Sequence, residues 1–357
     1  MSLKKALIAM SGGVDSSVAA YLTKQLGYDC TGITLKLFDN DDIAVKEKAC
    51  CSLDDIEDAR NVCRNLDIPY YVYNFKDSFR ENVISRFIHA YETGATPNPC
   101  IDCNRYIKFE KLMRRAEELD FDKVVTGHYA KVEYDDWRGR YLLKKAADPT
   151  KDQSYVLYSL TQKQLSRIFL PLGEMTKDEV RALAGKLGLI NAHKHDSQDI
   201  CFVPGGDYAR FIEQYTGKTY PHGDFVDEDG KVLGEHKGII RYTIGQRKGL
   251  GLALPHPMYV KEKDLNENKV ILCDHERLFS QELTATDVNL ISVERITEPL
   301  RVRARVRYNQ SEQPATVTQT DDNTIHVVFD EPQRAICKGQ AVVLYDGDVV
   351  VGGGTIE

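Results

Sequence analysis

The sequence lacks any long hydrophobic run and any excess of positive charge. No apolar stretch approaches the ~18 residues that would suggest a membrane span, and residues 1–13 lead directly into a glycine motif in place of a cleavable signal. Lysine and arginine number 47 against 54 aspartate and glutamate residues, a formal net charge of −7. This balance argues against a protein that holds nucleic acid through overall basicity. We therefore expect a cytoplasmic protein whose contacts with any RNA come from local patches.

Internal repeats and low-complexity tracts are also absent, and nine cysteines stand at irregular positions in 357 residues. A chain of this length is too long for one domain, because single cores stop growing at around 250 to 300 residues. Cysteines so placed do not resemble the disulfide framework of a small secreted domain, which favours reduced thiols, some of them reactive. With 28% charged and 42% hydrophobic residues, the composition is typical of a soluble globular protein.

Apolar runs typical of strands alternate with helical spacing over residues 1–205. The predicted strands are 3–10, 30–37, 69–75 and 123–126, the predicted helices are 16–26, 52–66, 78–91, 106–119 and 176–187, and a hairpin is predicted at 131–146. This alternation predicts an α/β fold with a doubly wound parallel sheet. From residue 282 onward, short alternating segments such as 301–308 and 324–329 predict a small β-barrel. The predicted domains are therefore 1–205, a small central domain at 206–281, and the C-terminal β-barrel at 282–357.

A glycine turn joins the first predicted strand to the first predicted helix, with the sequence Ser11-Gly12-Gly13-Val14-Asp15-Ser16-Ser17. Glycines let backbone N–H groups approach an anion, and a helix N-terminus adds partial positive charge, so the turn predicts a phosphate cradle. It lacks the lysine with which a P-loop follows a transferred γ-phosphate, which favours a site that grips pyrophosphate, with Asp15 available to hold Mg²⁺. The alternative is an ordinary strand-to-helix turn rich in serine and glycine.

Three cysteines lie in polar loops. Cys100 and Cys103 form a C-x-x-C within TPNPCIDCN at 96–104, which we expect to lie just before a helix whose N-terminus lowers the pKa of a thiol below ~8.5. Cys201 follows in DSQDICF at 196–202. No second C-x-x-C or spaced Cys/His pair completes a zinc site, so the three thiols suit either an iron–sulfur cluster or sulfur transfer by a thiol pair. The other six are expected to be small core or surface residues: Cys30, Cys50, Cys51, Cys63, Cys273 and Cys337.

Six motifs, in this order, resemble the tRNA-specific 2-thiouridylase (MnmA) family of the ATP pyrophosphatase (PP-loop) group. They are SGGVDSS at 11–17, TPNPCIDCN at 96–104, TGHYA at 126–130, KDQSY at 151–155, DSQDICF at 196–202 and TIGQRKGL at 243–250. The resemblance covers nearly the whole chain and implies an adenine nucleotide hydrolase-like first domain in a three-domain plan. It also implies a tRNA-uridine 2-sulfurtransferase that adenylates O2 of the wobble uridine, position 34, and replaces it with sulfur, giving 2-thiouridine, AMP and pyrophosphate.

The roles of the family's residues carry over by resemblance onto the matching positions. Cys103 falls on the nucleophilic cysteine and Cys201 on the carrier of the persulfide, while Cys100 stands where many members have an aspartate that is thought to assist catalysis. The ATP-contacting positions are Ala9, Met10, Ser11, Gly12, Gly13, Val14, Asp15, Ser16, Leu35 and Gly127. The positions around the target base are Asn98, Pro99 and Cys100. The tRNA-contacting positions are His128, Lys151, Asp152, Gln153, Arg307, Tyr308 and Gln340.

The resemblance implies ATP and Mg²⁺, tRNA as a partner, and a sulfur donor such as a cysteine desulfurase or a sulfur-relay protein. A persulfide on Cys201 is the favoured sulfur carrier, and the alternative is a [4Fe-4S] cluster held by Cys100, Cys103 and Cys201. Arg301, Arg303, Arg305 and Arg307 alternate with apolar residues, so as a strand they line one face, which is either a phosphate-binding face or a solvated one.

Two other functions compete with this interpretation. Another PP-loop adenylating synthetase would share the glycine loop but would have no use for the three cysteines. A non-catalytic RNA-binding or metal-carrying protein would not need an intact pyrophosphate loop.

Overall fold

Five parallel strands form the sheet of the first unit, in the order β3-β2-β1-β4-β7. The computed structural model describes residues 3–38, 53–192, 194 and 200–357. The strands are β1 (Lys5–Ala9), β2 (Asp29–Lys36), β3 (Tyr70–Asn74), β4 (Lys123–Val125) and β7 (Ile168–Phe169). The chain runs outward from β1 to β3 and then places β4 on the other side of β1. The strand order therefore reverses beside β1, where open α/β sheets bind their ligands.

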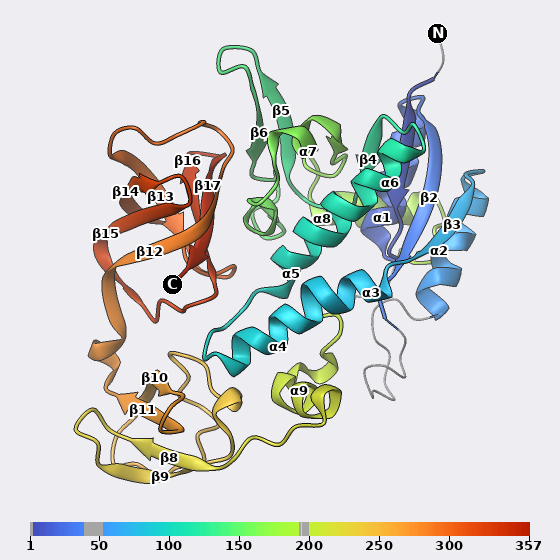
Figure 1. Ribbon diagram of the computed structural model, residues 1–357. Coiled ribbons are helices and arrows are strands. Elements are labelled where there is room, and N and C mark those ends of the chain that lie inside the picture. Colours follow the sequence, from blue (N-terminus) through green and yellow to red (C-terminus); the bar gives the residue numbers. More distant parts are fainter. Residues whose placement is uncertain (1–2, 39–52, 193, 195–199) are drawn as a thin grey trace.

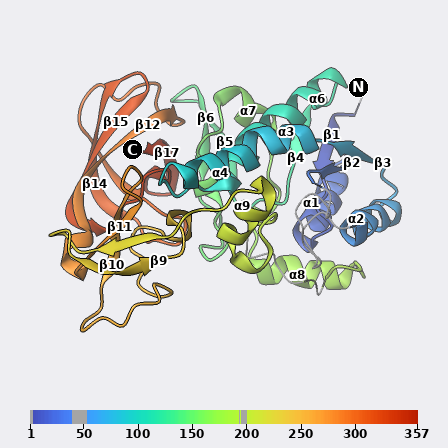
Figure 2. The ribbon, with the colours of Figure 1, turned by 60° about the horizontal axis from the view of Figure 1, so that its bottom comes forward.

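Helices cover both faces of this sheet. Ala6 and Ile8 of β1 pack with α1 (Val14–Gln25), α2 (Leu53–Asn65) and α8 (Lys177–Lys186), whereas Leu7 packs with the helical segment that ends in α6 (Leu112–Glu118). Figure 2 shows α6 and α8 on opposite sides of β1. Strands buried on both faces read as continuous apolar runs, which is why β1 could be predicted from its composition.

Two helical arms lie side by side between the sheet and the rest of the molecule (Figure 1). The first consists of α3 (Lys76–Phe79), a π-helical stretch η1 (Arg80–Ile84) and α4 (Ser85–Glu92). The second consists of α5 (Pro99–Asp102), a π-helical stretch η2 (Cys103–Lys111) and α6. Arg86 and Asp102 join the arms through an ion pair of 3.5 Å. The shorter helices of the first unit are η3 (Ser154–Leu157), α7 (Gln162–Arg167) and η4 (Pro204–Gly206).

The central unit is a four-stranded sheet in the order β10-β11-β8-β9. Its strands are β8 (Gly223–Val226), β9 (Val232–His236), β10 (Tyr259–Asp264) and β11 (Lys269–Cys273). Three short helices lie near them: α9 (Tyr208–Thr216), η5 (Ile239–Arg241) and η6 (His275–Leu278).

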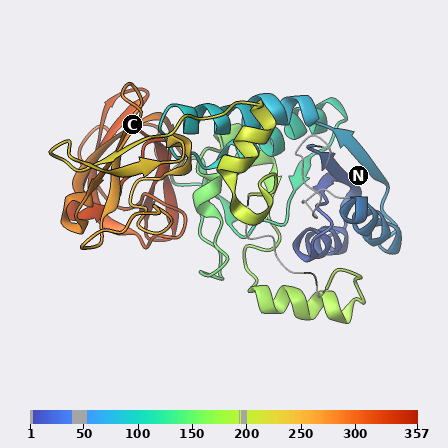
Figure 3. The same ribbon diagram turned by 90° about the horizontal axis from the view of Figure 1, so that it is seen from below.

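The last unit is a closed barrel, because β12 pairs with both β15 and β17 in the order β12-β15-β14-β13-β16-β17. Its strands are β12 (Phe279–Leu290), β13 (Leu300–Arg305), β14 (Gln313–Asp321), β15 (Thr324–Arg334), β16 (Ala341–Asp346) and β17 (Val349–Ile356). Alternate residues of these strands fill the interior. The barrel and the parallel sheet lie at opposite ends of the molecule, with the helical arms between them (Figure 3). The predicted fold class is confirmed.

Two local features differ from the expected elements. The hairpin of β5 (Lys131–Asp135) and β6 (Arg140–Lys144) extends the barrel sheet, because Lys144 pairs with Val349 of β17. The helix predicted from residue 106 begins at Pro99, and the predicted helix start at Ser52 lies outside the described residues. In the described part of the chain, no helix is both long and apolar enough to span a membrane.

Candidate active site

The glycine loop connects β1 to α1 and is closed by its own serines. The hydroxyls of Ser16 and Ser17 each donate to the carbonyl oxygen of Gly13 over 3.0 Å. Gly12 has φ of 74°, and a Cβ on it would lie 2.4 Å from the carbonyl oxygen of Asp55. Only glycine fits there, since both the backbone conformation and the contact exclude a side chain. The loop therefore has the strand–turn–helix geometry that presents N–H groups to an anion.

A cavity of about 220 Å³ opens at the carboxyl ends of β1, β2 and β4. Its lining consists of Ala9, Met10, Ser11, Asp15, Ser16, Ile33, Thr34, Leu35, Leu37, Lys108, Thr126, Gly127, His128 and Gln153. Of the predicted ATP-contacting positions, all but Gly12, Gly13 and Val14 are in this lining. The structure thus brings together residues from three separate motifs at the point where the strand order reverses.

Gly127 fixes the wall of the cavity opposite the glycine loop. A Cβ at this position would lie 2.8 Å from both the carbonyl carbon of Asp15 and the backbone nitrogen of Ser16. The end of β4 therefore packs directly on the backbone of α1's first turn, which no larger residue would allow.

Asp15, the residue that the sequence offers to Mg²⁺, already has partners. Lys177 donates to both of its carboxylate oxygens over 2.8 Å, and the hydroxyl of Tyr129 donates over 2.7 Å. Lys177 is buried in the first turn of α8. Both carboxylate oxygens of Asp15 are therefore occupied by hydrogen-bond donors, so this arrangement does not fit Asp15 as an open ligand for Mg²⁺.

Two residues that sequence reasoning missed hold the loop in place. Lys177 binds Asp15, and buried Asn191 donates through Nδ2 to the carbonyl oxygen of Gly12 over 3.1 Å and to the hydroxyl of Ser17 over 2.8 Å. The capping box formed by Thr176 and Glu179 predicted the start of α8 correctly. Nothing in the local sequence could show that this helix start would lie against a loop more than 150 positions earlier.

Cys100 and Cys103 lie inside a helix and not before it. Asn98 is the N-cap, with Oδ1 accepting from the backbone nitrogen of Cys100 over 3.2 Å, and Pro99 occupies the first turn. Cys100 is exposed, whereas Cys103 is buried. Burial raises the pKa of the Cys103 thiol to about 11, partly opposed by the positive charge of Lys108. Desolvation raises the pKa of the Cys100 thiol as well. The expected lowering is therefore wrong for both thiols, because desolvation of the thiolate outweighs the helix N-terminus.

Cys201 is half-buried, and its neighbour Phe202 attaches this segment to the first helical arm. The ring of Phe202 packs edge-on against Phe79 and Phe87, with centroid distances of 5.6 and 5.2 Å. Cys201 and Cys103 thereby pack against the same hydrophobic core. Residues 196–199 of the DSQDICF motif lie outside the described residues.

The described cysteines do not form a metal site. Over residues 3–38, 53–192, 194 and 200–357, no three His, Cys, Asp or Glu side chains are arranged to hold one ion. Cys30, Cys63, Cys273 and Cys337 are buried core residues, as predicted, and burial raises the pKa of the Cys30 thiol to about 11 and that of Cys63 to about 12. Cys50 and Cys51 lie outside the described residues.

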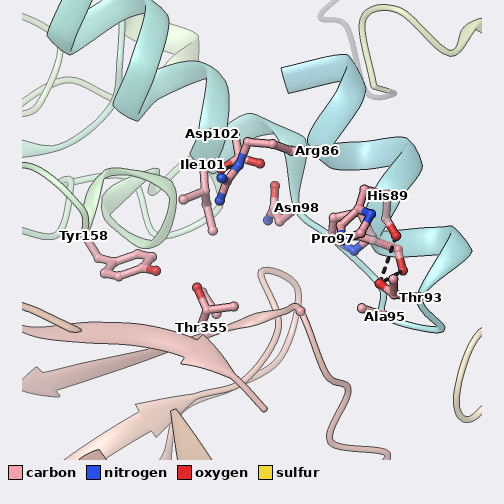
Figure 4. A pocket seen from close by; sticks show the side chains of 13 residues that line it. Arg86, His89, Thr93, Ala95, Pro97, Asn98, Ile101, Asp102, Tyr158 and Thr355 are labelled. Carbon is pink, nitrogen blue, oxygen red and sulfur yellow. Dashed lines mark hydrogen bonds and ion pairs between the residues drawn. The ribbon is translucent and has the colours of Figure 1, made fainter. Parts of the chain in front are cut away.

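A second cavity, of about 260 Å³, lies between the helical arms and the barrel. Figure 4 shows Arg86 and Asp102 from the arms, Asn98 just before the second arm, Tyr158 from the chain after η3 and Thr355 from β17 around one space. Burial raises the pKa of Asp102 to about 6, although Arg86 opposes the shift. Of the predicted target-base residues, Asn98 lines this cavity, whereas Pro99 and Cys100 do not.

Two of the predicted tRNA contacts lie in the first cavity. His128 and Gln153 both line it, and Gln153 accepts from the backbone nitrogen of Tyr129 over 3.0 Å. His128 is buried, with Nδ1 at 2.7 Å from the hydroxyl of Thr126, and burial holds its pKa well below 6.5. The imidazole is therefore neutral at physiological pH.

The remaining predicted tRNA contacts join the three units to one another. Arg307 donates to the carbonyl oxygens of Ile244 and Ala335, and Gln340 donates to that of Thr96 over 2.7 Å. Tyr308 donates a hydrogen bond over 3.1 Å to the carbonyl oxygen of Asp152, the residue after Lys151. The carboxylate of Asp152 is buried and accepts hydrogen bonds from the backbone nitrogen of Ala146 and the hydroxyl of Ser154. The side chains of Arg307, Tyr308, Gln340 and Asp152 thus make internal hydrogen bonds, and the contact of these residues and of Lys151 with tRNA stays a prediction.

Arg301, Arg303 and Arg305 form the predicted strand face, but their guanidinium groups have carboxylate partners, and Arg307, predicted as part of the same row, lies beyond the end of β13 and binds backbone carbonyls. Val302 and Ala304 of β13 are buried and the arginines between them point outward. Arg301 binds both oxygens of Asp330 over 2.8 and 2.7 Å. Arg303 and Arg305 lie 3.9 and 3.5 Å from Glu312. An ion-paired face of this kind favours the solvated interpretation over phosphate binding.

Three family models match the chain. They are the tRNA methyl transferase HUP domain over residues 4–205, the tRNA methyl transferase PRC-barrel domain over residues 209–274 and the aminomethyltransferase beta-barrel domain over residues 280–356.

Curated relatives match over their full length. The tRNA-specific 2-thiouridylase MnmA of Clostridioides difficile (strain 630) is 53% identical over 354 residues, covering 99% of this chain and 98% of that protein. The protein of the same name from Acetivibrio thermocellus is 51% identical over 359 residues and covers 100% of both. Among solved structures, a 4-thiouridine synthetase–RNA complex with bound ATP covers 60% of this chain and 50% of its own, with 17% identity and a TM-score of 0.35, a likeness too low to support a conclusion.

Proposed function

The chain belongs to the tRNA-specific 2-thiouridylase family, and from this premise we propose that it is an ATP-using tRNA sulfurtransferase that converts a uridine of the anticodon to 2-thiouridine. The matched family models carry the word methyl transferase in their names, whereas the full-length relatives are named thiouridylases. One observation supports thiolation. The helical stretch η2 that contains Cys103 also contains Lys108, whose side chain lines the cavity beside the glycine loop.

Adenylation converts the O2 atom of the uridine into part of a good leaving group. O2 of uracil is a poor leaving group, so it is first bonded to the α-phosphorus of ATP while pyrophosphate leaves, and AMP then becomes the leaving group. We assign the cavity at the ends of β1, β2 and β4 to ATP, with the glycine loop gripping the pyrophosphate. Mg²⁺ accompanies ATP in this proposal.

Sulfur then passes through two cysteines. A persulfide on Cys201 delivers its terminal sulfur to C2 and expels AMP, which leaves the base bonded to Cys201 through a disulfide. Cys103 attacks the Cys201 sulfur, releases the thiolated base and forms a Cys103–Cys201 disulfide that an external thiol reduces. The supporting observation is that both residues pack against one core beside the first helical arm. A sulfur donor such as a cysteine desulfurase or sulfur-relay protein regenerates the persulfide.

The target base must leave its stack to reach these groups, which costs a few kcal/mol and is easiest in a single-stranded loop such as the anticodon. We propose that the wobble uridine enters beside Asn98, Pro99 and Cys100. The alternative route uses a [4Fe-4S] cluster on Cys100, Cys103 and Cys201, and it requires these thiols to move together from the arrangement of the described residues.

The test is mass spectrometry of nucleosides from unmodified tRNA, incubated anaerobically with the protein, ATP, Mg²⁺ and a persulfide or sulfide donor. We expect an ATP-dependent 2-thiouridine peak that needs no iron. The Cys201→Ala variant should lose this peak yet keep tRNA-stimulated pyrophosphate release, because adenylation precedes sulfur transfer. Cys273→Ala, at a buried cysteine of the central unit, is the matched control and should thiolate normally.

Three results would contradict parts of the proposal. A Cys201→Ala protein that still thiolates removes the persulfide assignment. A peak that depends on reconstituted iron selects the cluster route. Absence of any peak with competent tRNA and donor favours another adenylating synthetase with a small-molecule acceptor.

A further inference from the structure

We propose that Lys108 is a catalytic residue of this reaction, a cation that contacts the α-phosphate of ATP and stabilises the charge that develops as the uridine oxygen displaces pyrophosphate. The assignment rests on the proposed function, because it gives Lys108 a role in the adenylation step. No sequence motif indicated a role for Lys108. Its position in the fold indicates one.

Lys108 carries the positive charge that the nucleotide cavity offers to a ligand. It is half-buried and lines the cavity, and within the described part of the chain no carboxylate pairs with it. The other lysine near the loop, Lys177, is committed to Asp15 through two bonds of 2.8 Å. Lys194, further along the chain, is bound to Asp55 and Asp58.

His128 shares the cavity with Lys108 but does not supply charge. Burial holds the pKa of its imidazole well below 6.5, and the nearby ammonium of Lys108 lowers it further. A neutral imidazole donates or accepts a hydrogen bond, whereas a phosphorane-like transition state gains negative charge that a cation stabilises more strongly. Lys108 is therefore the group in the cavity suited to that charge.

The π-helical turn explains how one helix serves both the cysteines and the nucleotide. Lys108 follows Cys103 by five positions, and residues five apart on an α-helix of 3.6 residues per turn are rotated by about 140°. Both residues lie in η2, where hydrogen bonds run from i to i+5 and the turn is wider. The fifth residue then returns much closer to the face of the first. Desolvation raises the pKa of both the Cys100 and Cys103 thiols, and the positive charge of Lys108 opposes that rise at both, as expected for an ammonium on their side of the helix.

The chemistry balances without a change in Lys108 itself. O2 of the base bonds to the α-phosphorus, the bond from that phosphorus to the bridging oxygen breaks, and pyrophosphate leaves with the electron pair. Lys108 stays protonated and interacts with the non-bridging oxygens, whose charge is greatest at the transition state. The residue should therefore affect the rate of adenylation more than the affinity for ATP.

The experiment compares full-length Lys108→Met, Lys108→Arg and Lys111→Met proteins with the wild type. Lys111 lies on the same π-helical stretch but does not line the cavity, so its variant controls for the helix. Single-turnover pyrophosphate release is measured with ATP and unmodified tRNA, and the Kd for ATP is measured separately. We expect Lys108→Met to slow release on the order of 10²–10³-fold with less than about tenfold change in Kd, Lys108→Arg to recover part of the rate, and Lys111→Met to match the wild type.

The failures are distinguishable. If the wild type binds ATP but releases no pyrophosphate with tRNA, the proposed function falls, and the role of Lys108 with it. If the wild type reacts and Lys108→Met stays within about threefold of it, only the role of Lys108 is overturned. Equal losses in Lys108→Met and Lys108→Arg together with weakened ATP binding would also overturn it, since they indicate a structural residue. Should Lys108→Met shift the unfolding temperature, Lys108→Gln is the second neutral variant, judged by the same criteria.

Discussion

The sequence suggested two phosphate-binding regions, the glycine loop of the first unit and the arginine row of the barrel. The structure supports the first as a binding site and not the second. Around the glycine loop, residues at the ends of β1, β2 and β4 converge on one cavity, which Ser11, Asp15 and Ser16 of the loop also line. On β13 the arginines do share a face, but Arg301 is bound by Asp330, and Arg303 and Arg305 lie near Glu312. The glycine loop thus borders a cavity that a ligand can enter, whereas the arginines of β13 already have carboxylate partners within the chain.

The difference lies in what kind of group does the binding. A strand–turn–helix loop binds anions through backbone N–H groups and a helix terminus, which no distant side chain can neutralise. A guanidinium group binds whichever carboxylate or phosphate comes near, so its role depends on residues that are remote in sequence. Local motifs are for this reason better predictors of a site when they act through the backbone.

The largest expected effect tests the close packing of the glycine loop. Gly127→Ala places a Cβ 2.8 Å from backbone atoms of Asp15 and Ser16, so the loop must shift. We expect ATP affinity to fall at least tenfold and the free energy of unfolding to fall by about 1–3 kcal/mol, as for other overpacked sites. Isothermal titration with ATP and urea denaturation measure the two quantities.

Gly185→Ala is the matched control for this change. Gly185 is exposed in α8, and a Cβ there meets no atom within 4 Å. Alanine should keep ATP affinity unchanged and raise the free energy of unfolding by up to about 1 kcal/mol, since glycine is costly inside a helix. Equal ATP affinities of the two variants would mean that the contact of Gly127 with the loop does not shape the site.

Structural features that depend on neighbouring residues could be predicted from the sequence, whereas contacts between residues far apart in the chain could not. The strands β1 to β4, the glycine loop and the capping box of α8 follow from local patterns, and all of them were found. The pairing of Lys177 with Asp15 and the pairing of β6 with β17 join segments far apart, so no window of sequence could show them. The helix start at Pro99 could have been read from Asn98 as N-cap and proline in the first turn. The role of Lys108 could not have been predicted from the sequence, because the position of its side chain depends on a π-helical turn.

A smaller effect concerns His128, which was predicted to contact tRNA and lies in the cavity of the glycine loop. Above pH 6.5 its imidazole is neutral in both the folded and unfolded states. As the pH falls below 6.5, the unfolded chain binds a proton there while burial keeps the folded state neutral, so the protein loses stability. The contribution reaches at most about 1.4 kcal/mol per pH unit. Between pH 7 and pH 5, His128→Asn should lose less of its free energy of unfolding than the wild type, as measured by urea denaturation. Parallel losses in the two proteins would show that this imidazole takes up its proton while folded.

The smallest effect is expected at the arginine row. Its variants test whether this face differs from the glycine loop because its guanidinium groups are ion-paired. Each phosphate that a protein neutralises contributes about 0.7–0.9 to the slope of log affinity against log salt. Arg301 is held by both oxygens of Asp330, so Arg301→Met should leave tRNA affinity within about twofold and this slope unchanged. Asp330→Asn frees the guanidinium group and should steepen the slope, which fluorescence anisotropy with labelled tRNA can measure. A slope that falls in Arg301→Met would show that phosphate displaces the carboxylate in the complex. A slope unchanged in the first variant and steeper in the second would mean that Asp330 keeps Arg301 from binding RNA.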